Sequence, residues 1–469
     1  MTNMNSLKYI SLFVVLFSLQ SCFTAKTYVR PEQVVDEKYF RSDQISDDTS
    51  SIANLDWREI FKDEKLQDYI ATALANNLDI RMALQQIEVA AAYVRQGKAG
   101  YFPTFNLGAD YAMNSPSLNS LSGQNLDERS TLGQYELFGN LSWEADIWGK
   151  IRSNDRATRA EFMQTVAAHQ AIKSRLVSAV ASAYYQLVSL DAQRNITEET
   201  IETRKQSIET INALKSSGYV TEVAVKQTEA QLFNAQALLL DIDNNIKLME
   251  NTMCVLMGES PHGIDRNALE SQTMDTLFSI GVPVQLLSNR PDVLAAENGL
   301  ISAFELTNVA RSNFYPSLRL TAGGGLQSLT FEKLFNVNSL FASIVGSLAQ
   351  PIFNGRQVRT QYEVRRAQQE AAYLNYKQTI LTASKEVSDA LYTLQRDKEK
   401  IQLKQQEYQA YTQAIEYSEE LLNYGLANYL EVLTARQNAL NAQLAVTNTA
   451  FSRLNAMVQL YRAVGGGWK

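Results

Sequence analysis

Apolar residues recur at an unbroken interval of seven through the second half of the chain. The series is Tyr373, Ile380, Val387, Leu394, Ile401, Tyr408, Ile415 and Leu422. A seven-residue repeat sustained over so many turns predicts a long helix that packs along another helix in a left-handed coiled coil. Residues 225–256 and 430–461 carry mostly apolar residues at alternating spacings of three and four, which predicts further helices of this kind. The chain is therefore expected to consist mainly of long, paired helices.

The proline positions limit where these helices lie. All eight prolines fall outside three long blocks, namely residues 150–217, 222–258 and 356–463. A proline inside a helix costs about 3 kcal/mol or more. The helices predicted from these blocks are 150–217, 222–258, 356–424 and 429–463. Gly218 and Gly425 fall between consecutive helices, where glycine takes the left-handed conformation that ends a helix, so each is predicted to form the turn of a helical hairpin.

The chain also contains a tandem duplication. Tyr101-Phe102-Pro103 recurs as Phe314-Tyr315-Pro316, and residues 214–225 (LKSSGYVTEVAV) match residues 421–432 (LLNYGLANYLEV). This period is much longer than the 20–50 residues of solenoid repeats. We therefore predict two copies of one domain. The predicted boundaries are 61–260 for the first repeat, 261–290 for the connecting equatorial segment and 291–469 for the second repeat.

Each repeat contains two segments in which apolar and polar residues alternate. The strands predicted from this alternation are about 104–114, 135–147, 317–329 and 339–349, with Phe138 and Gly139 as exceptions to it. Each is long enough for a tilted strand to cross a bilayer, although a soluble sheet with one buried face shows the same alternation. The acidic residues expected on the polar face are Asp110, Glu136, Glu144 and Asp146. Asp146 has a second interpretation, as the cap of the helix that begins near Lys150.

The N-terminus has the features of a secretory signal. Residues 10–19 form an apolar stretch that is too short to span a bilayer, and Lys8 precedes it. Leu19-Gln20-Ser21-Cys22 resembles a bacterial lipobox, which predicts a signal peptide over 1–21 and lipidation of Cys22. The alternative is an ordinary cleaved signal with a chance cysteine. Residues 22–60 are expected to form the lipid anchor and an extended lead.

The composition argues against several classes of function. The chain has only two histidines and two cysteines, too few for most zinc, haem or Cys/His catalytic sites. Its formal net charge is −7, whereas nucleic-acid-binding proteins concentrate positive charge. We expect no enzyme activity, no catalytic residue, no metal site, no cofactor and no nucleic-acid partner.

Taken in order, these motifs resemble the TolC-type outer-membrane efflux proteins, in particular the lipoprotein branch typified by OprM and NodT. The resemblance spans about residues 55–469 and is carried by Tyr315-Pro316-Ser317-Leu318, Pro351-Ile352-Phe353-Asn354-Gly355-Arg356, Tyr424-Gly425, Tyr429-Leu430-Glu431-Val432-Leu433 and Gly465-Gly466-Gly467-Trp468. It implies a mainly α fold with a transmembrane β part, in which a homotrimer closes a 12-stranded β-barrel continuous with an α-helical periplasmic tunnel. It also implies an outer-membrane location and an exit duct for small toxic compounds or drugs. A periplasmic adaptor (membrane fusion) protein and an inner-membrane RND-type transporter driven by protons are the implied partners.

The resemblance further implies a gate at the helical tips, on the periplasmic side. Family members carry acidic residues beyond the tip glycine, and Glu431 stands six residues after Gly425, while Thr434 occupies a position where many members carry Asp. Packing of Leu430, Leu433 and Val223 is expected to contribute to closure. An ordinary solvated helix position is the alternative for Glu431.

Two other functions remain open from the sequence. An outer-membrane duct for protein secretion would share this architecture. A coiled-coil scaffold of the cell envelope would explain the helices, but it would leave the four alternating strands without a role.

Overall fold

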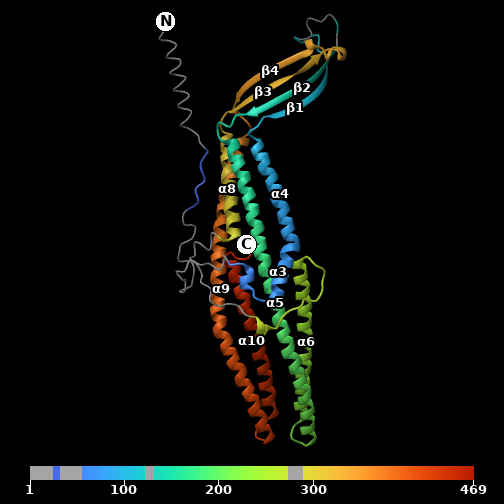
Figure 1. The fold of residues 1–469 in the computed structure, drawn as a ribbon, viewed down its shortest axis with the longest axis vertical. Coiled ribbons are helices and arrows are strands. Elements are labelled where there is room, and N and C mark those ends of the chain that lie inside the picture. Colours follow the sequence, from blue (N-terminus) through green and yellow to red (C-terminus); the bar gives the residue numbers. More distant parts are fainter. Residues whose placement is uncertain (1–24, 32–54, 122–127, 129–130, 273–288) are drawn as a thin grey trace. The chain divides into compact units, whose positions relative to one another are not determined.

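A computed structural model describes residues 25–31, 55–121, 128, 131–272 and 289–469 (Figure 1). The predicted signal peptide and Cys22 lie outside the described residues. The chain divides into two compact units: a strand unit of residues 1–31, 88–163 and 298–374, and a helical unit of residues 32–87, 164–297 and 375–469. Each unit combines segments from both predicted repeats.

The strand unit contains one antiparallel sheet in the order β1-β2-β3-β4 (Figure 1). Its strands are β1 (Thr104–Asn114), β2 (Leu132–Glu144), β3 (Ser317–Ser328) and β4 (Leu340–Ala349). Two short 3-10 helices, η5 (Phe331–Lys333) and η6 (Val337–Ser339), connect β3 to β4. The register pairs Leu107 with Gly139 and Ala322 with Leu141 and Ile344, so most apolar residues of the four strands share one face. The other face is largely polar.

The second strand differs from its predicted range of 135–147. It begins at Leu132, which pairs with Asn114 at the end of β1, and it ends at Glu144. The chain leaves the sheet there because Asp146 accepts hydrogen bonds from the backbone N–H groups of Ile151 (2.8 Å) and Arg152 (3.0 Å). Asp146 therefore caps the following helix and is not part of the strand face, which corrects its predicted position there.

Each strand is joined directly to a helix. α4 (Leu78–Ala99) precedes β1, and α5 (Lys150–Ser216) follows β2. In the second repeat, α8 (Pro291–Ser312) precedes β3, and α9 (Gln357–Asn423) follows β4. At about 1.5 Å per residue, the 67 residues of α5 and of α9 each correspond to a length of about 100 Å. None of the helices in the described part of the chain is both long enough and apolar enough to cross a membrane.

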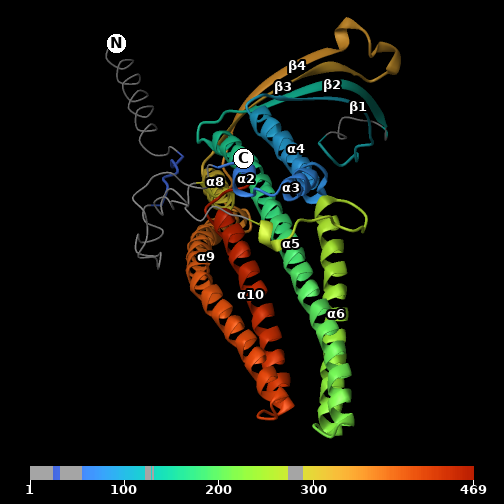
Figure 2. The same ribbon diagram turned by 60° about the horizontal axis from the view of Figure 1, so that its bottom comes forward.

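The helical unit consists mainly of two helical hairpins (Figure 2). α5 turns at Gly218 into α6 (Glu222–Met257), and α9 turns at Gly425 into α10 (Tyr429–Ala463). The short helices α2 (Trp57–Ile60) and α3 (Glu64–Asn76) pack at the other end of the hairpins, together with the 3-10 helix η4 (Leu269–Ser271).

The core of the helical unit lies where α2 and α3 meet α5, α6 and α10. Its largest fully buried side chains include Phe61, Leu66, Tyr184 and Tyr461. Glycine is required next to this core at Gly466, because a Cβ atom there would lie only 2.2 Å from the ring of Tyr461. The tail therefore packs directly against the core.

Asp63 joins three parts of this unit through one carboxylate. It caps α3 by accepting from two backbone N–H groups, and it also accepts from Tyr184 Oη (2.8 Å), Asn267 Nδ2 (3.1 Å) and Gln272 Nε2 (2.7 Å). Burial alone would raise the pKa of Asp63. The hydrogen bonds outweigh burial and hold the pKa below its ordinary value.

We predict that Asp63→Asn lowers the melting temperature by about 2–4 °C at neutral pH, and that this difference disappears in acid. Because the fold favours the charged form, the stabilisation is fully present above the unfolded pKa of about 3.9. It is lost as the pH falls through the lower, folded pKa. Thermal melts of both proteins between pH 7 and pH 2.5 measure the difference. Asp68→Asn, an exposed position on α3, is the control, and a difference that stays constant with pH would contradict the role of the charge.

Candidate functional site

The two hairpin turns have the same geometry. Gly218 and Gly425 have φ values of 81° and 71°, in the left-handed region. Their N–H groups donate to Lys215 O and Leu422 O, and the next N–H in each turn donates to the carbonyl five residues before it. The predicted helix-tip turns are thus present at both glycines, and the equivalent geometry reflects the duplication of the sequence.

Apolar side chains from both hairpins meet near these turns. The buried members of this tip cluster are Ile211, Val225, Tyr429, Val432 and Leu433. Of the three residues predicted to close the gate by packing, Leu433 belongs to the cluster. Leu430 and Val223 are 48% and 63% exposed and do not belong to it. Packing within one chain therefore joins the hairpins through Leu433, while Leu430 and Val223 remain available on the surface.

The acidic residues in the first turns of α6 and α10 differ in their partners. Glu222 forms ion pairs with Lys215 and with Lys226. Glu431 is exposed and has no ion pair within the described residues. Thr434, one turn further along α10, is also exposed and donates its hydroxyl to Leu430 O (2.8 Å). Only one hairpin of the chain thus carries an uncompensated carboxylate in the first turn after its tip.

Two arginines connect all four helices of the hairpins. Arg204 of α5 is 4% exposed and donates to the backbone carbonyl of Gln231 in α6 and to Gln437 Oε1 in α10 (2.8 Å). Arg436 of α10 donates to Ser207 Oγ in α5 and to Glu419 Oε1 in α9 (Nε–Oε1 3.1 Å). We call this group the arginine clasp.

The arginine clasp has two positive charges and one carboxylate. Burial lowers the pKa of Arg204, and the nearby charge of Arg436 lowers it further. Arg204 hydrogen bonds only to uncharged oxygens among the described residues, so its burial is costly. The clasp therefore links the two hairpins through polar contacts that include a buried arginine paired with no carboxylate in the described part of the chain.

The acidic residues predicted on the polar strand face are placed as follows. Asp110 and Glu136 face each other across β1 and β2. Glu144, at the end of β2, forms ion pairs with Lys150 (2.9 Å) and Arg319 (3.3 Å). Asp110 and Glu136 are thus adjacent, Glu144 is paired with basic side chains, and Asp146 is a helix cap.

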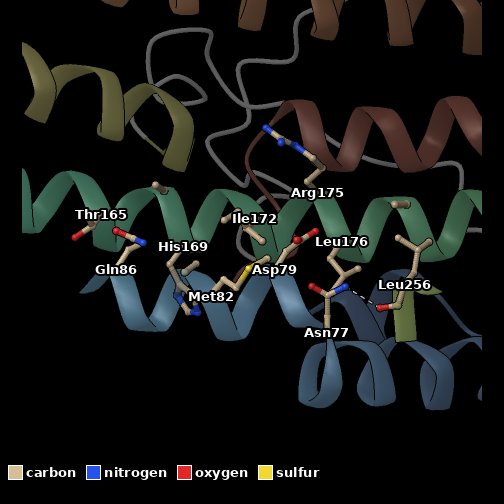
Figure 3. Close-up of a pocket in the computed structure, with 13 residues that line it drawn as sticks. Asn77, Asp79, Met82, Gln86, Thr165, His169, Ile172, Arg175, Leu176 and Leu256 are labelled. Carbon is tan, nitrogen blue, oxygen red and sulfur yellow. Dashed lines mark hydrogen bonds between the residues drawn. The ribbon is translucent and has the colours of Figure 1, made fainter. Parts of the chain in front are cut away.

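A groove of about 570 Å³ lies between α4 and α5 in the helical unit (Figure 3). Met82, Ile172 and Leu176 contribute apolar surface to it, and Asn77 closes one end by donating to Leu256 O (2.9 Å). Burial and the nearby Lys173 lower the pKa of His169, so its imidazole is neutral at pH 7. Because Met82 remains 59% exposed, a single chain leaves this apolar surface uncovered.

Comparison with known proteins assigns the architecture. The outer membrane efflux protein family matches residues 69–259 and 282–466, which is most of the chain and includes both hairpins and all four strands. The chain belongs to this family. The predicted family, the efflux function and the outer-membrane location are thereby confirmed, as is a fold of long helices with a four-stranded β part. The match favours the efflux duct over the secretion duct and the scaffold.

The efflux protein is similar to proteins named as pump components over nearly its whole length. It is 27% identical over 459 residues to the cation efflux system protein CusC of Escherichia coli O6:H1, which covers 97% of this chain and 98% of CusC. It is 28% identical over 466 residues to the toluene efflux pump outer membrane protein TtgC of Pseudomonas putida, covering 98% and 95%. A solved CusC structure has a TM-score of 0.83 at 26% identity and covers 95% of this chain and 100% of its own.

The arginine clasp of the efflux protein was not predicted from its sequence. One signal was present, because Ile201, Arg204, Ser207 and Ile211 are all buried at spacings of three or four along α5. A charged residue at a position of the apolar seam indicates a buried polar contact. The partners lie on other helices and cannot be identified from this spacing.

We predict that Arg436→Met loosens the hairpin ends of the efflux protein without unfolding it. Loss of the contacts to Ser207 and Glu419 should raise amide hydrogen exchange in residues 204–225 and 419–436 by about 5–10-fold, equivalent to about 1–1.4 kcal/mol. Exchange near Asp63 should not change.

Arg396→Met is the matched control for this experiment. Arg396 is exposed on α9 and pairs with Glu399 on the same helix (3.2 Å), so its loss should leave the exchange of both hairpin ends unchanged. Equal effects of the two substitutions would show that the arginine clasp does not connect the hairpins.

Proposed function

We propose that three copies of this chain form a passive conduit through the outer membrane. Each copy would contribute four strands to a 12-stranded barrel and its helices to a periplasmic tunnel. The observation that carries this proposal is the exposed apolar face of the sheet. The large side chains on this face of the outer strands, each at least 67% exposed, are Phe105, Leu107, Met113, Leu340, Ile344 and Leu348.

Lipid is the environment in which this face is stable. A continuous apolar surface of this kind is unfavourable in water. The strands have 10–13 residues, and about 9–11 residues suffice for a tilted strand to cross the hydrocarbon layer. The apolar face would therefore contact lipid, and the opposite face, with Asp110 and Glu136, would line the lumen. A lumen of this charge favours cations.

The sheet edges support closure by further copies. β1 and β4 are the two edges of the sheet, and unpaired backbone groups cost several kcal/mol each in lipid. Pairing β4 of one copy with β1 of the next satisfies these groups. The uncovered groove between α4 and α5 is consistent with a neighbouring copy, because its apolar surface would be buried on assembly.

The hairpin tips are the proposed gate. Three Glu431 side chains brought near the axis would form an acidic ring, with Thr434 one turn beyond and Leu430, Leu433 and Val223 packed around the tips. The ring would attract counter-ions and narrow the opening. The arginine clasp supports this assignment, because it holds the two hairpins of each chain together at the same end.

The exposed tips also suit a docking partner. Tyr219, Tyr424 and Leu426 are between 73% and 77% exposed. We propose that they contact a periplasmic adaptor (membrane fusion) protein, which connects the conduit to an inner-membrane RND-type transporter. The transporter supplies the energy, so the conduit needs no catalytic residue. Small cations and toxic organic compounds are the proposed cargo, since relatives are named for cation and toluene efflux.

We predict that Glu431→Ala opens the gate. Purified protein in planar bilayers should conduct ions, and removal of the carboxylate ring should raise the conductance at least about twofold. Cells carrying the variant should become more susceptible to antibiotics that enter through the open conduit.

Glu222→Ala provides the matched control. Glu222 occupies the first turn of the other hairpin and is already paired with lysines of that hairpin, so its loss should change conductance little. Unchanged conductance and susceptibility of Glu431→Ala would remove Glu431 from the gate. Absence of any current from the wild-type protein would contradict the conduit itself.

Lipidation of Cys22 is a separate proposal, supported by the sequence Leu19-Gln20-Ser21-Cys22. We predict that Cys22→Ala abolishes incorporation of labelled palmitate in cells, while oligomers still form because the strand and helix contacts are intact. Cys254→Ala, at the other cysteine of the chain, is the control and should retain the label. Persistent labelling of Cys22→Ala would refute the lipid anchor.

A further inference from the structure

The polar face of the sheet contains one aromatic row. The strand register places Gly108, Phe138, Gly325 and Phe341 opposite one another on β1, β2, β3 and β4. The adjacent row on one side is Asn106, Asn140, Gly323 and Ser343, and the row on the other side includes Asp110, Glu136 and Gln327. Two phenylalanines thus interrupt a face that is otherwise polar at this level. Phe138 is the residue that breaks the apolar–polar alternation of β2.

The glycines of this row determine how the rings lie. A Cβ atom at Gly108 would be 2.6 Å from the Phe138 ring, so this ring reaches across to β1 and occupies the space of the missing side chain. A Cβ atom at Gly325 would be 2.0 Å from the backbone carbonyl of Leu137, so only glycine fits there. The strip between Phe138 and Phe341 therefore carries no side chain of β3. With strands about 4.8 Å apart, the backbones of Phe138 and Phe341 lie about 10 Å from each other across it, and the Phe138 ring extends from there toward β1.

Negative charge lies beside the aromatic row. Asp110 and Glu136 are two residues further along their strands, which is about 7 Å. Neither carboxylate forms an ion pair among the described residues. The basic side chain on this face, Arg319, is three rows away on the opposite side of the aromatic row and is paired with Glu144. Aromatic rings next to uncompensated carboxylates complement a cation that carries apolar groups.

We propose that Phe138 and Phe341 form a binding step for organic cations, such as quaternary ammonium compounds and protonated amines with apolar substituents. The inference rests on the proposed conduit, in which this face lines the lumen. A small inorganic cation keeps its hydration shell and interacts with the carboxylates alone. An organic cation also contacts an exposed part of a ring, and Gly325 adds no side chain that would obstruct its approach along this row. The aromatic row thus distinguishes two kinds of positively charged cargo.

The experiment compares binding and conduction of tetrabutylammonium. Isothermal titration of the full-length protein in nanodiscs measures binding independently of current, and block of potassium current in planar bilayers measures occupancy of the lumen. The double variant Phe138→Ala with Phe341→Ala should weaken both by about tenfold, while the unblocked potassium current is unchanged or higher. Phe138→Leu with Phe341→Leu should weaken them similarly, because leucine is apolar but has no π face.

Phe105→Ala is the matched control. Phe105 also lies over a glycine of the neighbouring strand, since a Cβ atom at Gly139 would be 2.9 Å from its ring. It stands on the opposite, apolar face of the same sheet, so its loss removes an equivalent packing contact without changing the proposed site. Tetrabutylammonium binding and block should match the wild-type values.

The outcomes separate the site from the conduit. Wild-type binding in the double alanine variant would overturn the proposed step, and so would wild-type binding in the double leucine variant, because recognition would then not depend on the aromatic rings. Binding that depends on Phe138 and Phe341 without any potassium current in the wild-type protein would support the site and contradict the conduit. Potassium current that tetrabutylammonium fails to block in the wild-type protein would support the conduit and contradict the site.

Discussion

Backbone hydrogen bonding at the two edges of the sheet constrains everything else in this protein. The apolar face of the four strands is incompatible with water, and the N–H and C=O groups along the outer sides of β1 and β4 are incompatible with lipid unless they are paired. A single chain cannot meet both conditions. Pairing of β1 and β4 with strands of further copies satisfies both conditions, so the sheet itself requires oligomerisation.

The connections between strands and helices extend the order of the sheet into the helices. Every strand is joined to a long helix through a short connection, so the order of the strands in the sheet also fixes which helices are neighbours. The hairpins of the helical unit then bring residues from α5, α6, α9 and α10 into the tip cluster and the arginine clasp. The apolar contacts make the association favourable, while the buried positive charge of Arg204 limits it. Such a balance would suit the proposed gate, in which the hairpins are together at rest and separate during transport.

The periodic parts of the structure could be predicted from the sequence because their signals are local. α10 was expected at 429–463 and occupies those residues, since Asn428 caps it and no proline interrupts it. β1 likewise matches its predicted range. The end of β2 was wrong because alternation alone continues past Glu144, whereas the backbone is diverted by the hydrogen bonds to Asp146.

The contacts between distant segments could not be predicted in the same way. Asp63 receives hydrogen bonds from residues 121, 204 and 209 positions away, and no spacing in the sequence encodes such distances. Two contacts of the arginine clasp, Arg204–Gln437 and Arg436–Ser207, span 233 and 229 positions, although Arg204 marks an anomaly in the seam of α5. Phe138 was visible in the sequence as an exception to the alternation. Its neighbours could be identified only from the strand register, which places it beside Gly108 and in the same row as Phe341.

The unequal first turns of the two hairpins have a consequence for symmetry. Glu222 is paired with lysines of its own hairpin, while Glu431 forms no ion pair in the part of the chain that the structure describes. Duplication alone would give an assembly of three chains six equivalent tips, and a partner would then have six identical places to bind. With these charges, tips that carry a paired Glu222 alternate with tips that carry an unpaired Glu431. The ring of six tips then has three-fold symmetry. A partner protein that occupies every tip must therefore recognise two different surfaces, either with two faces of one molecule or with two conformations of it.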